Sequence, residues 1–115
     1  ITLGGRPQEI VLSRSGRTLY IANQAGWIDK YDVASERRIC RLRLRAGAFG
    51  LALGPDDRTL LVSLPSAGIV EVVNAHQWRV EHSLAVGGRP RRIAISGDGD
   101  VAVVANEAGW VTFIR

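Results

Sequence analysis

Arginine carries almost all the positive charge of this 115-residue chain, because Lys30 is the only lysine among its 15 basic residues. A guanidinium group is a planar fork of donors that matches carboxylate and phosphate, and it also stacks on aromatic rings. One set of arginines lies within or directly after two copies of the tetrapeptide "GGRP", at residues 4–7 and 87–90. With neighbouring polar and aromatic residues, it forms a candidate site for a carboxylate, a phosphate or an acidic peptide. The candidate residues are Arg6, Gln8, Phe49, Arg89, Arg91 and Arg92.

A second set of arginines lies between residues 37 and 45. Alternate residues of a strand share a face, so the last three of the set point the same way if this segment is extended. Such a stripe could bind a nucleic acid or another polyanion. Exposed charge on an edge strand also prevents aggregation, and the lack of interleaved aromatic residues favours that interpretation over nucleic-acid binding. The polyanion candidates are Arg37, Arg38, Arg41, Arg43 and Arg45.

No arrangement of residues points to catalysis, a metal or a cofactor. Cys40 is the only cysteine, which excludes an internal disulfide and a thiolate metal site, and His76 and His82 are the only histidines. Asp98 and Asp100 in "SGDGD" supply too few oxygen ligands for a calcium loop. The "GGRP" segments are not followed by a helix whose N-terminus could hold phosphate. The sequence therefore predicts a non-catalytic module with no catalytic residues, no metal and no cofactor.

Composition is typical of a globular domain, with 46% hydrophobic and 23% charged residues. No run approaches the ~18 apolar residues of a membrane-spanning helix, so we expect no membrane insertion. The first residues lack the basic start and apolar stretch of a signal peptide. Since the sequence contains no Met, we expect a processed chain or a piece of a longer one.

An internal repeat organises the chain. Residues 4–27 align without gaps on residues 87–110, so that "NQAGW" at 23–27 matches "NEAGW" at 106–110. A middle copy at residues 45–69 lies near half that spacing, with one extra residue near Leu64 to Ser66. A period in this range that is built from short strands is typical of a propeller or a solenoid.

Each repeat contains four strand-like pieces. In the first unit, "EIVLS" is followed by a Gly- and Ser-rich turn and then by "TLYIAN", which is apolar on both faces. The third piece, "WIDKYD", begins after a Gly, and in the fourth piece, residues 40–44, polar side chains alternate with apolar ones. Four antiparallel strands with graded burial make a propeller blade, although a solenoid or a sandwich could share the strand count. We predict an all-β fold, a partial β-propeller over residues 1–115 with units at about 4–44, 45–86 and 87–115.

Both chain ends fall inside a repeat. Ile1–Leu3 aligns with Leu42–Leu44 at the end of a fourth strand, and Phe113–Arg115 aligns with the end of a third strand. The expected strand order is therefore d-abcd-abcd-abc. Three blades cannot close a ring, because propellers have about four to eight. We expect either a two-fold assembly into a six-bladed ring or a fragment completed by the remaining blades of a longer chain.

Two segments, Gly16 to Asn23 and Gly87 to Ser96, resemble the YVTN-type β-propeller repeat of surface-layer and periplasmic seven-bladed-type proteins. The resemblance implies a bacterial, extracytoplasmic protein. It also implies that the loops before each first strand share one rim with the turns between second and third strands, which brings the first arginine set together.

On that basis we expect a protein or a small anionic ligand to bind at this rim. Two alternatives remain open. One is a fragment of a propeller enzyme, such as a quinone- or haem-dependent oxidoreductase or a lyase, since related repeats occur in such oxidoreductases. The other is polyanion or DNA binding through the second arginine set. The "GGRP" segments could also serve only to turn the chain into the innermost strand, because Gly permits unusual backbone angles and Pro fixes φ.

Overall fold

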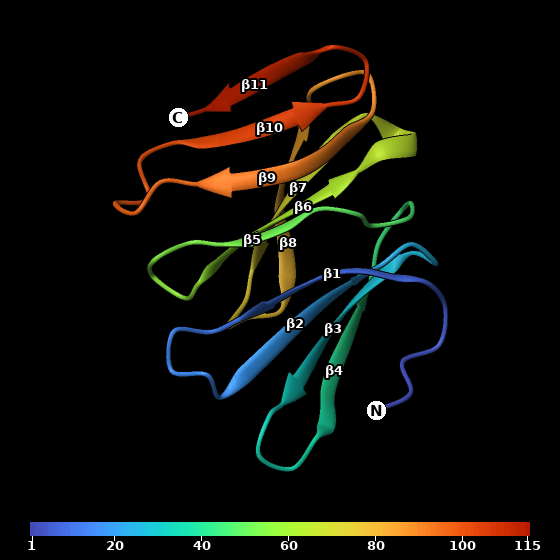
Figure 1. Ribbon diagram of the computed structural model, residues 1–115, viewed down its shortest axis with the longest axis vertical. Coiled ribbons are helices and arrows are strands. Elements are labelled where there is room, and N and C mark those ends of the chain that lie inside the picture. Colours follow the sequence, from blue (N-terminus) through green and yellow to red (C-terminus); the bar gives the residue numbers. More distant parts are fainter.

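A computed structural model describes all 115 residues and shows three antiparallel sheets, which confirms the all-β prediction (Figure 1). We refer to them as the first, second and third sheets. The first contains β1 (Pro7–Leu12), β2 (Thr18–Asn23), β3 (Trp27–Asp32) and β4 (Arg37–Arg43); the second contains β5 (Leu51–Leu53), β6 (Thr59–Leu64), β7 (Ile69–Asn74) and β8 (Arg79–Ala85); the third contains β9 (Pro90–Ile95), β10 (Ala102–Asn106) and β11 (Trp110–Ile114). Within each sheet the strands are adjacent in chain order.

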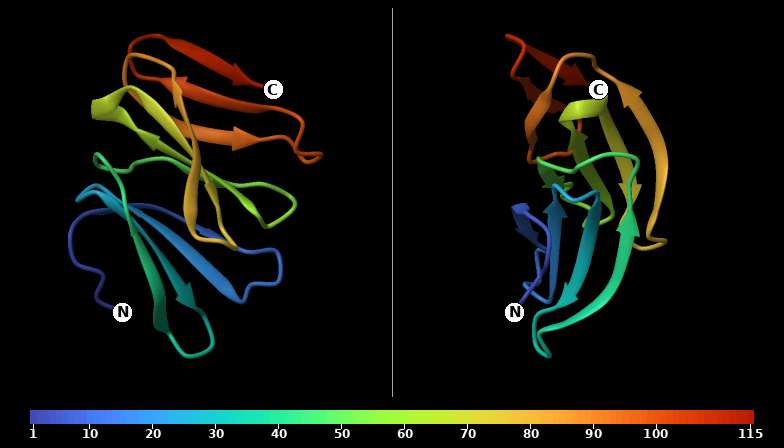
Figure 2. Two further views of the ribbon diagram at one scale, coloured as in Figure 1. Left: turned by 180° about the vertical axis from the view of Figure 1, so that it is seen from behind. Right: turned by 90° about the vertical axis from the view of Figure 1, so that its right-hand side faces the viewer.

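The sheets stack face to face, and the second sheet is buried on both sides (Figure 2). Successive side chains of a strand point to opposite faces. Leu60 accordingly packs into a core shared with Tyr20 and Ile28 of the first sheet, while Leu61 packs against Val104 of the third. This two-sided burial explains why β6 is apolar on both faces from Leu60 to Val62. Strand β1 lies beside β5, and β5 lies beside β9, so the first strands of the three sheets run together.

The outer face of each end sheet is uncovered. Ile10 of the first sheet is 60% exposed, whereas Leu51 at the equivalent repeat position of the second sheet is 2% exposed. On the third sheet Val111 and Phe113 are also exposed. The stack is therefore open at both ends, and no sheet closes it into a ring.

The predicted strand at residues 1–3 does not form. Ile1–Leu3 has no strand partner, and Ile1 is exposed. A strand needs a free sheet edge, and the edge of β11 that lacks a fourth strand lies at the opposite end of the molecule (Figure 1). The observed order is four, four and three strands, without the leading one.

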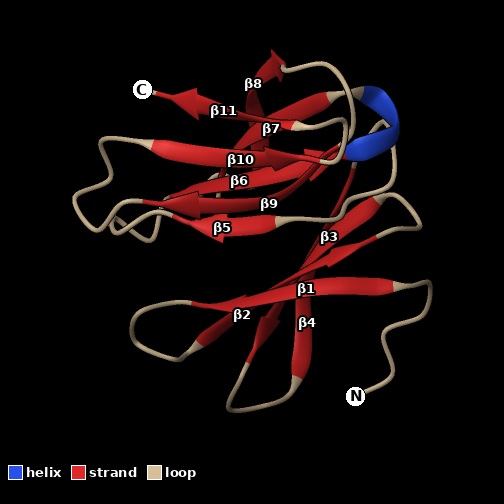
Figure 3. Cartoon of the chain, turned by 45° about the horizontal axis from the view of Figure 1, so that its top comes forward, coloured by secondary structure: helices blue, strands red, loops and turns tan.

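The extra residue of the middle repeat lies in a single 3₁₀ turn, Pro65–Ala67, which ends at Gly68 with φ 66° (Figure 3). Proline fits the first position of such a turn because it has no N–H to satisfy. The turn replaces the short connection that follows β2 and β10. The structure contains no helix long and apolar enough to cross a membrane.

Candidate anion-binding site

Asn23 anchors the loop that leads into the first sheet. Its Oδ1 accepts hydrogen bonds from the N–H groups of Arg6 and Ala25, both at 2.9 Å, and its Nδ2 donates to the carbonyl of Gly4 at 3.0 Å. A side chain on Gly5 would collide with the Asn23 amide, and Gly5 has a positive φ of 55°. The double glycine therefore lets the loop close onto the asparagine.

Asn106 repeats the arrangement in the third sheet. It accepts from the N–H groups of Arg89 (2.9 Å) and Ala108 (3.0 Å), and it donates to the Gly87 carbonyl at 2.8 Å. The pentapeptides "NQAGW" and "NEAGW" thus mark the same polar anchor in two sheets. The anchors hold the two "GGRP" loops at the same end of their sheets as the turns that follow β2 and β10.

A serine draws the third sheet against the second. The Ser63 hydroxyl accepts from the Gly50 N–H at 2.7 Å and donates to the Arg91 carbonyl at 2.6 Å. The N–H of Phe49 donates to the Ser63 carbonyl at 3.0 Å. These bonds hold the start of β9 beside the start of β5, and so they place Arg91 next to Phe49.

Two guanidinium groups approach the Phe49 ring. The Cζ atom of Arg91 lies 4.3 Å from the ring centroid and that of Arg92 lies 5.6 Å from it. The aromatic face attracts cations electrostatically, and this contact holds the Arg91 fork in one orientation. Arg92 is held a second time, because its Nη1 lies 2.8 Å from the Glu9 carboxylate on β1.

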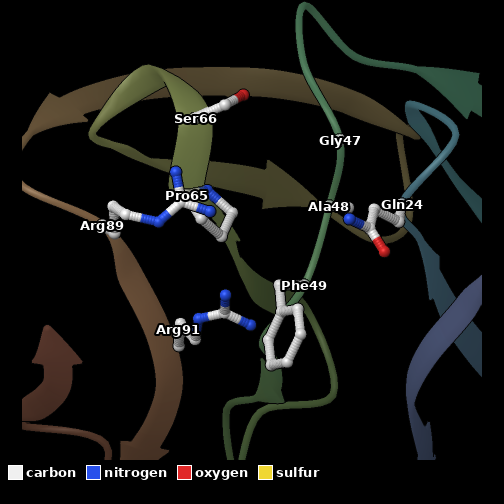
Figure 4. A pocket seen from close by; sticks show the side chains of 8 residues that line it. All are labelled: Gln24, Gly47, Ala48, Phe49, Pro65, Ser66, Arg89 and Arg91. Carbon is white, nitrogen blue, oxygen red and sulfur yellow. The ribbon is translucent and has the colours of Figure 1, made fainter. Parts of the chain in front are cut away.

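A cavity of about 150 Å³ opens beside this ring (Figure 4). Since one water occupies roughly 30 Å³ in the liquid, the cavity has room for one small ion or a few waters. Arg89 and Arg91 direct their guanidinium groups into it from one side, and Phe49 closes another side. Among its other lining residues are Gln24, Ala48 and Pro65.

Glu107, in the turn after β10, contacts both arginines. Arg89 Nε donates to Glu107 Oε1 at 3.2 Å, and Arg91 Nε lies 2.7 Å from Glu107 Oε2. The second contact is an ion pair, because its donor angle is too far from linear for a hydrogen bond. Both arginines meet the carboxylate through Nε, and the structure shows no protein partner for their terminal Nη groups. Those Nη groups are the available donors of the site.

Three of the six predicted rim residues, Phe49, Arg89 and Arg91, line the cavity. Gln8 is one contact away, since its Nε2 donates to Gln24 Oε1 at 2.8 Å. The other two predicted residues, Arg6 and Arg92, do not line the cavity. Arg92 is engaged with Glu9, and Arg6 is exposed, with its backbone rather than its side chain held by Asn23.

The prediction missed Gln24, Pro65, Ser66 and Glu107. The repeat holds a signal for two of them, because Gln24 and Glu107 are the differing letters of "NQAGW" and "NEAGW". In the same alignment Gln8 corresponds to Arg91. The first sheet therefore has a neutral Gln8–Gln24 pair where the third has the Arg91–Glu107 ion pair, which concentrates the charge at the third sheet.

The second arginine set does not form one stripe. Arg41 binds Asp29 through two hydrogen bonds, from Nε at 2.7 Å and from Nη2 at 3.0 Å. Asp29 is only 1% exposed, and its hydrogen bonds raise the pKa of Arg41. The Arg41 guanidinium also stacks 4.0 Å from the ring centroid of Trp27. Arg41 is thus already bound within its own sheet.

The remaining arginines of that set point to different neighbours. Arg43 lies 5.7 Å from the Trp27 ring, on the same face as Arg41, as expected. Arg45 does not share that face, because β4 ends at residue 43 and the chain crosses to the second sheet, where Arg45 donates to Ser83 at 3.1 Å. Arg37 and Arg38 are exposed. Fewer guanidinium groups are therefore free to bind a polyanion here than the spacing of these arginines in the sequence predicts.

Burial raises the pKa of the Cys40 thiol, which disfavours the nucleophilic thiolate. No group of three or more His, Cys, Asp or Glu side chains is arranged to hold a metal ion.

No protein-family model matches the sequence, and no curated protein is significantly similar to it. Among solved structures, the chain is similar to hydrazine synthase of Kuenenia stuttgartiensis, with a TM-score of 0.90 and 27% identity. The match covers 99% of this chain and 34% of that chain. The present chain thus spans about a third of the length of its structural neighbour.

Proposed function

We propose that the three sheets are consecutive blades of a β-propeller of the YVTN type and that the cavity at its rim binds a small oxyanion. The propeller assignment is supported by the repeat, by the face-to-face stacking and by the adjacent first strands β1, β5 and β9. On the outer faces of the two end sheets, repeat positions that are buried between neighbouring sheets are exposed. This exposure is expected if further blades or a second copy complete the ring. The resemblance to YVTN-type repeats supports an extracytoplasmic location.

The observation that carries the binding proposal is the pair of arginine forks in the cavity. Arg89 and Arg91 present their Nη groups there, and the Phe49 ring orients one of them. Terminal guanidinium nitrogens in this arrangement suit two oxygens of a phosphate, a sulfate or a carboxylate. Partial enclosure of the site strengthens this attraction relative to open water.

We expect inorganic phosphate to bind this site and the Arg89→Gln variant to bind it about tenfold more weakly, because one charge-assisted pair of hydrogen bonds is removed. Titration of the ¹⁵N-labelled protein with phosphate, followed by NMR shifts of the arginine Nε–Hε groups, measures the affinity. Affinity should also fall as ionic strength rises.

The matched control is Arg37→Gln, which removes the same charge from an exposed position at the opposite end of the first sheet. It should bind phosphate like the unmodified protein. Since Arg89 is half exposed, its replacement should leave the fold intact, and the backbone NMR spectrum checks this. Equal phosphate affinity in the two variants would contradict the proposed site.

A second candidate function is a segment of a propeller enzyme, such as a quinone- or haem-dependent oxidoreductase or a lyase. The supporting observation is the likeness to hydrazine synthase over 99% of this chain. In that case the rim cavity would serve a larger active centre to which further segments contribute. An absorption spectrum of the protein purified from its native source tests this candidate: a bound visible chromophore supports it, and a colourless protein opposes the oxidoreductase version.

A further inference from the structure

The Glu107 carboxylate lies where an anionic ligand of the cavity would also be attracted. It contacts Nε of both Arg89 and Arg91, the two residues that supply the donors of the site. A carboxylate there neutralises part of the positive field that an incoming oxyanion would meet. The protein thus carries its own anion next to the proposed binding site.

The backbone of Glu107 is fixed, but its side chain is lightly held. Its N–H donates to the Arg89 carbonyl at 2.9 Å, and the turn is closed by the Gly109 N–H donating to the Asn106 carbonyl at 3.0 Å. The side chain is 50% exposed, and of its two arginine contacts one is long and the other is off-line. Rotation about side-chain bonds is therefore enough to withdraw the carboxylate, with no movement of the sheet.

The first repeat shows that the same turn forms without this charge. Gln24 occupies the position of Glu107 and bonds to Gln8, which occupies the position of Arg91. A neutral residue is thus compatible with the same turn and the same asparagine anchor. The carboxylate of Glu107 is therefore not needed to form the turn. What distinguishes it from Gln24 is its negative charge next to the two arginines.

We propose that Glu107 is an internal competitor that regulates this cavity, and that the ligand is a single small oxyanion which displaces its carboxylate from Arg89 and Arg91. This inference rests on the proposed oxyanion site. The cavity has room for an ion of the size of phosphate, sulfate or a short carboxylate. The Nη groups of both arginines already face the cavity, so the oxyanion binds them there, and repulsion between the two negative charges moves the Glu107 carboxylate off Nε and into solvent. The departing carboxylate carries one negative charge and the oxyanion one or two, so binding changes the net charge of the cavity by at most about one unit.

The test compares phosphate affinity in the unmodified protein and in Glu107→Gln. The variant should bind phosphate about three- to tenfold more tightly, because two partly exposed ion pairs no longer compete. Sulfate and acetate, titrated in the same way, separate tetrahedral oxyanions from carboxylates as ligands. The reciprocal variant, Gln24→Glu, places a carboxylate in the lining of the cavity and should weaken phosphate binding.

Glu36→Gln is the charge-matched control, since it removes one carboxylate from the exposed turn between β3 and β4. It should leave phosphate affinity unchanged. If Glu107→Gln binds phosphate no more tightly than Glu36→Gln does, the competitor role is wrong while the oxyanion site stands. If neither the unmodified protein nor Glu107→Gln binds any of the three anions, both the site and its regulation are wrong.

Discussion

Replacing Gly50 with alanine should lower the free energy of unfolding by about 3 kcal/mol or more, at the upper end of the cost of overpacking a core. An added Cβ would overlap the carbonyl oxygen of Arg91 and press on the hydroxyl of Ser63. The carbonyl is backbone, so it cannot rotate out of the way. The expected result is displacement of β9 from β5, measured as a lower midpoint of urea unfolding.

The same variant should weaken phosphate binding. Gly50 and Arg91 are joined through the Ser63 hydroxyl, so a displaced β9 carries Arg91 away from Phe49. A misplacement of the order of 1 Å is enough to lose well-oriented polar contacts. Stability and affinity should therefore fall together, which links the packing of two sheets to the geometry of the cavity.

Gly97→Ala is the matched control for this prediction. An added Cβ there meets no atom within 4 Å, and the residue has no positive φ. It should leave stability unchanged or raise it by up to ~1 kcal/mol through a less flexible unfolded chain. Adding Ser63→Ala to Gly50→Ala should not rescue the fold, because the clash with the Arg91 carbonyl remains. Recovery in that double variant would show that the close approach of β5 and β9 is not what requires the glycine.

Strand positions were predictable where both faces of a strand are buried. The segment 59–64 is apolar on both of its faces at Leu60 and Leu61, because these two side chains face different sheets, and its ends match β6. Prediction was wrong at Ile1–Leu3, where a pattern suited to a strand lies at the opposite end of the molecule from the edge of β11 that lacks a fourth strand. A local pattern shows which segments can be strands, whereas pairing depends on edges that only the assembled sheets provide.

The candidate site was predictable only in part. Alignment of the repeats placed Arg89 and Arg91 at one rim because "GGRP" recurs before a first strand. It could not show that Arg41 is held by Asp29, since ion pairing across a strand depends on register and on burial of the carboxylate. Nor could it show that Glu107 meets both rim arginines. Such contacts depend on side-chain orientation, which strand patterns do not encode.

Replacing Arg41 with alanine should lower the free energy of unfolding by about 3 kcal/mol, because it leaves the buried Asp29 carboxylate without its partner. The two hydrogen bonds from Arg41 satisfy both oxygens of that carboxylate. Arg41→Lys should recover only part of the loss, since an ammonium group cannot reproduce the two-pronged contact. Urea unfolding monitored by tryptophan fluorescence measures each variant, and Trp27 beside Arg41 reports the local change.

Arg43→Ala is the control, because Arg43 lies on the same face of β4 but is exposed and has no carboxylate partner. It should change stability by less than about 0.5 kcal/mol. In the double variant Asp29→Leu with Arg41→Met, most of the loss should disappear, since an apolar pair of similar volume leaves no unpaired charge. A large loss in the double variant would mean that the Trp27 stacking, not the ion pair, is the main contribution. If Arg41→Ala instead kept full stability and lost affinity for a polyanion, Arg41 would belong to a binding surface rather than to the structure of the first sheet.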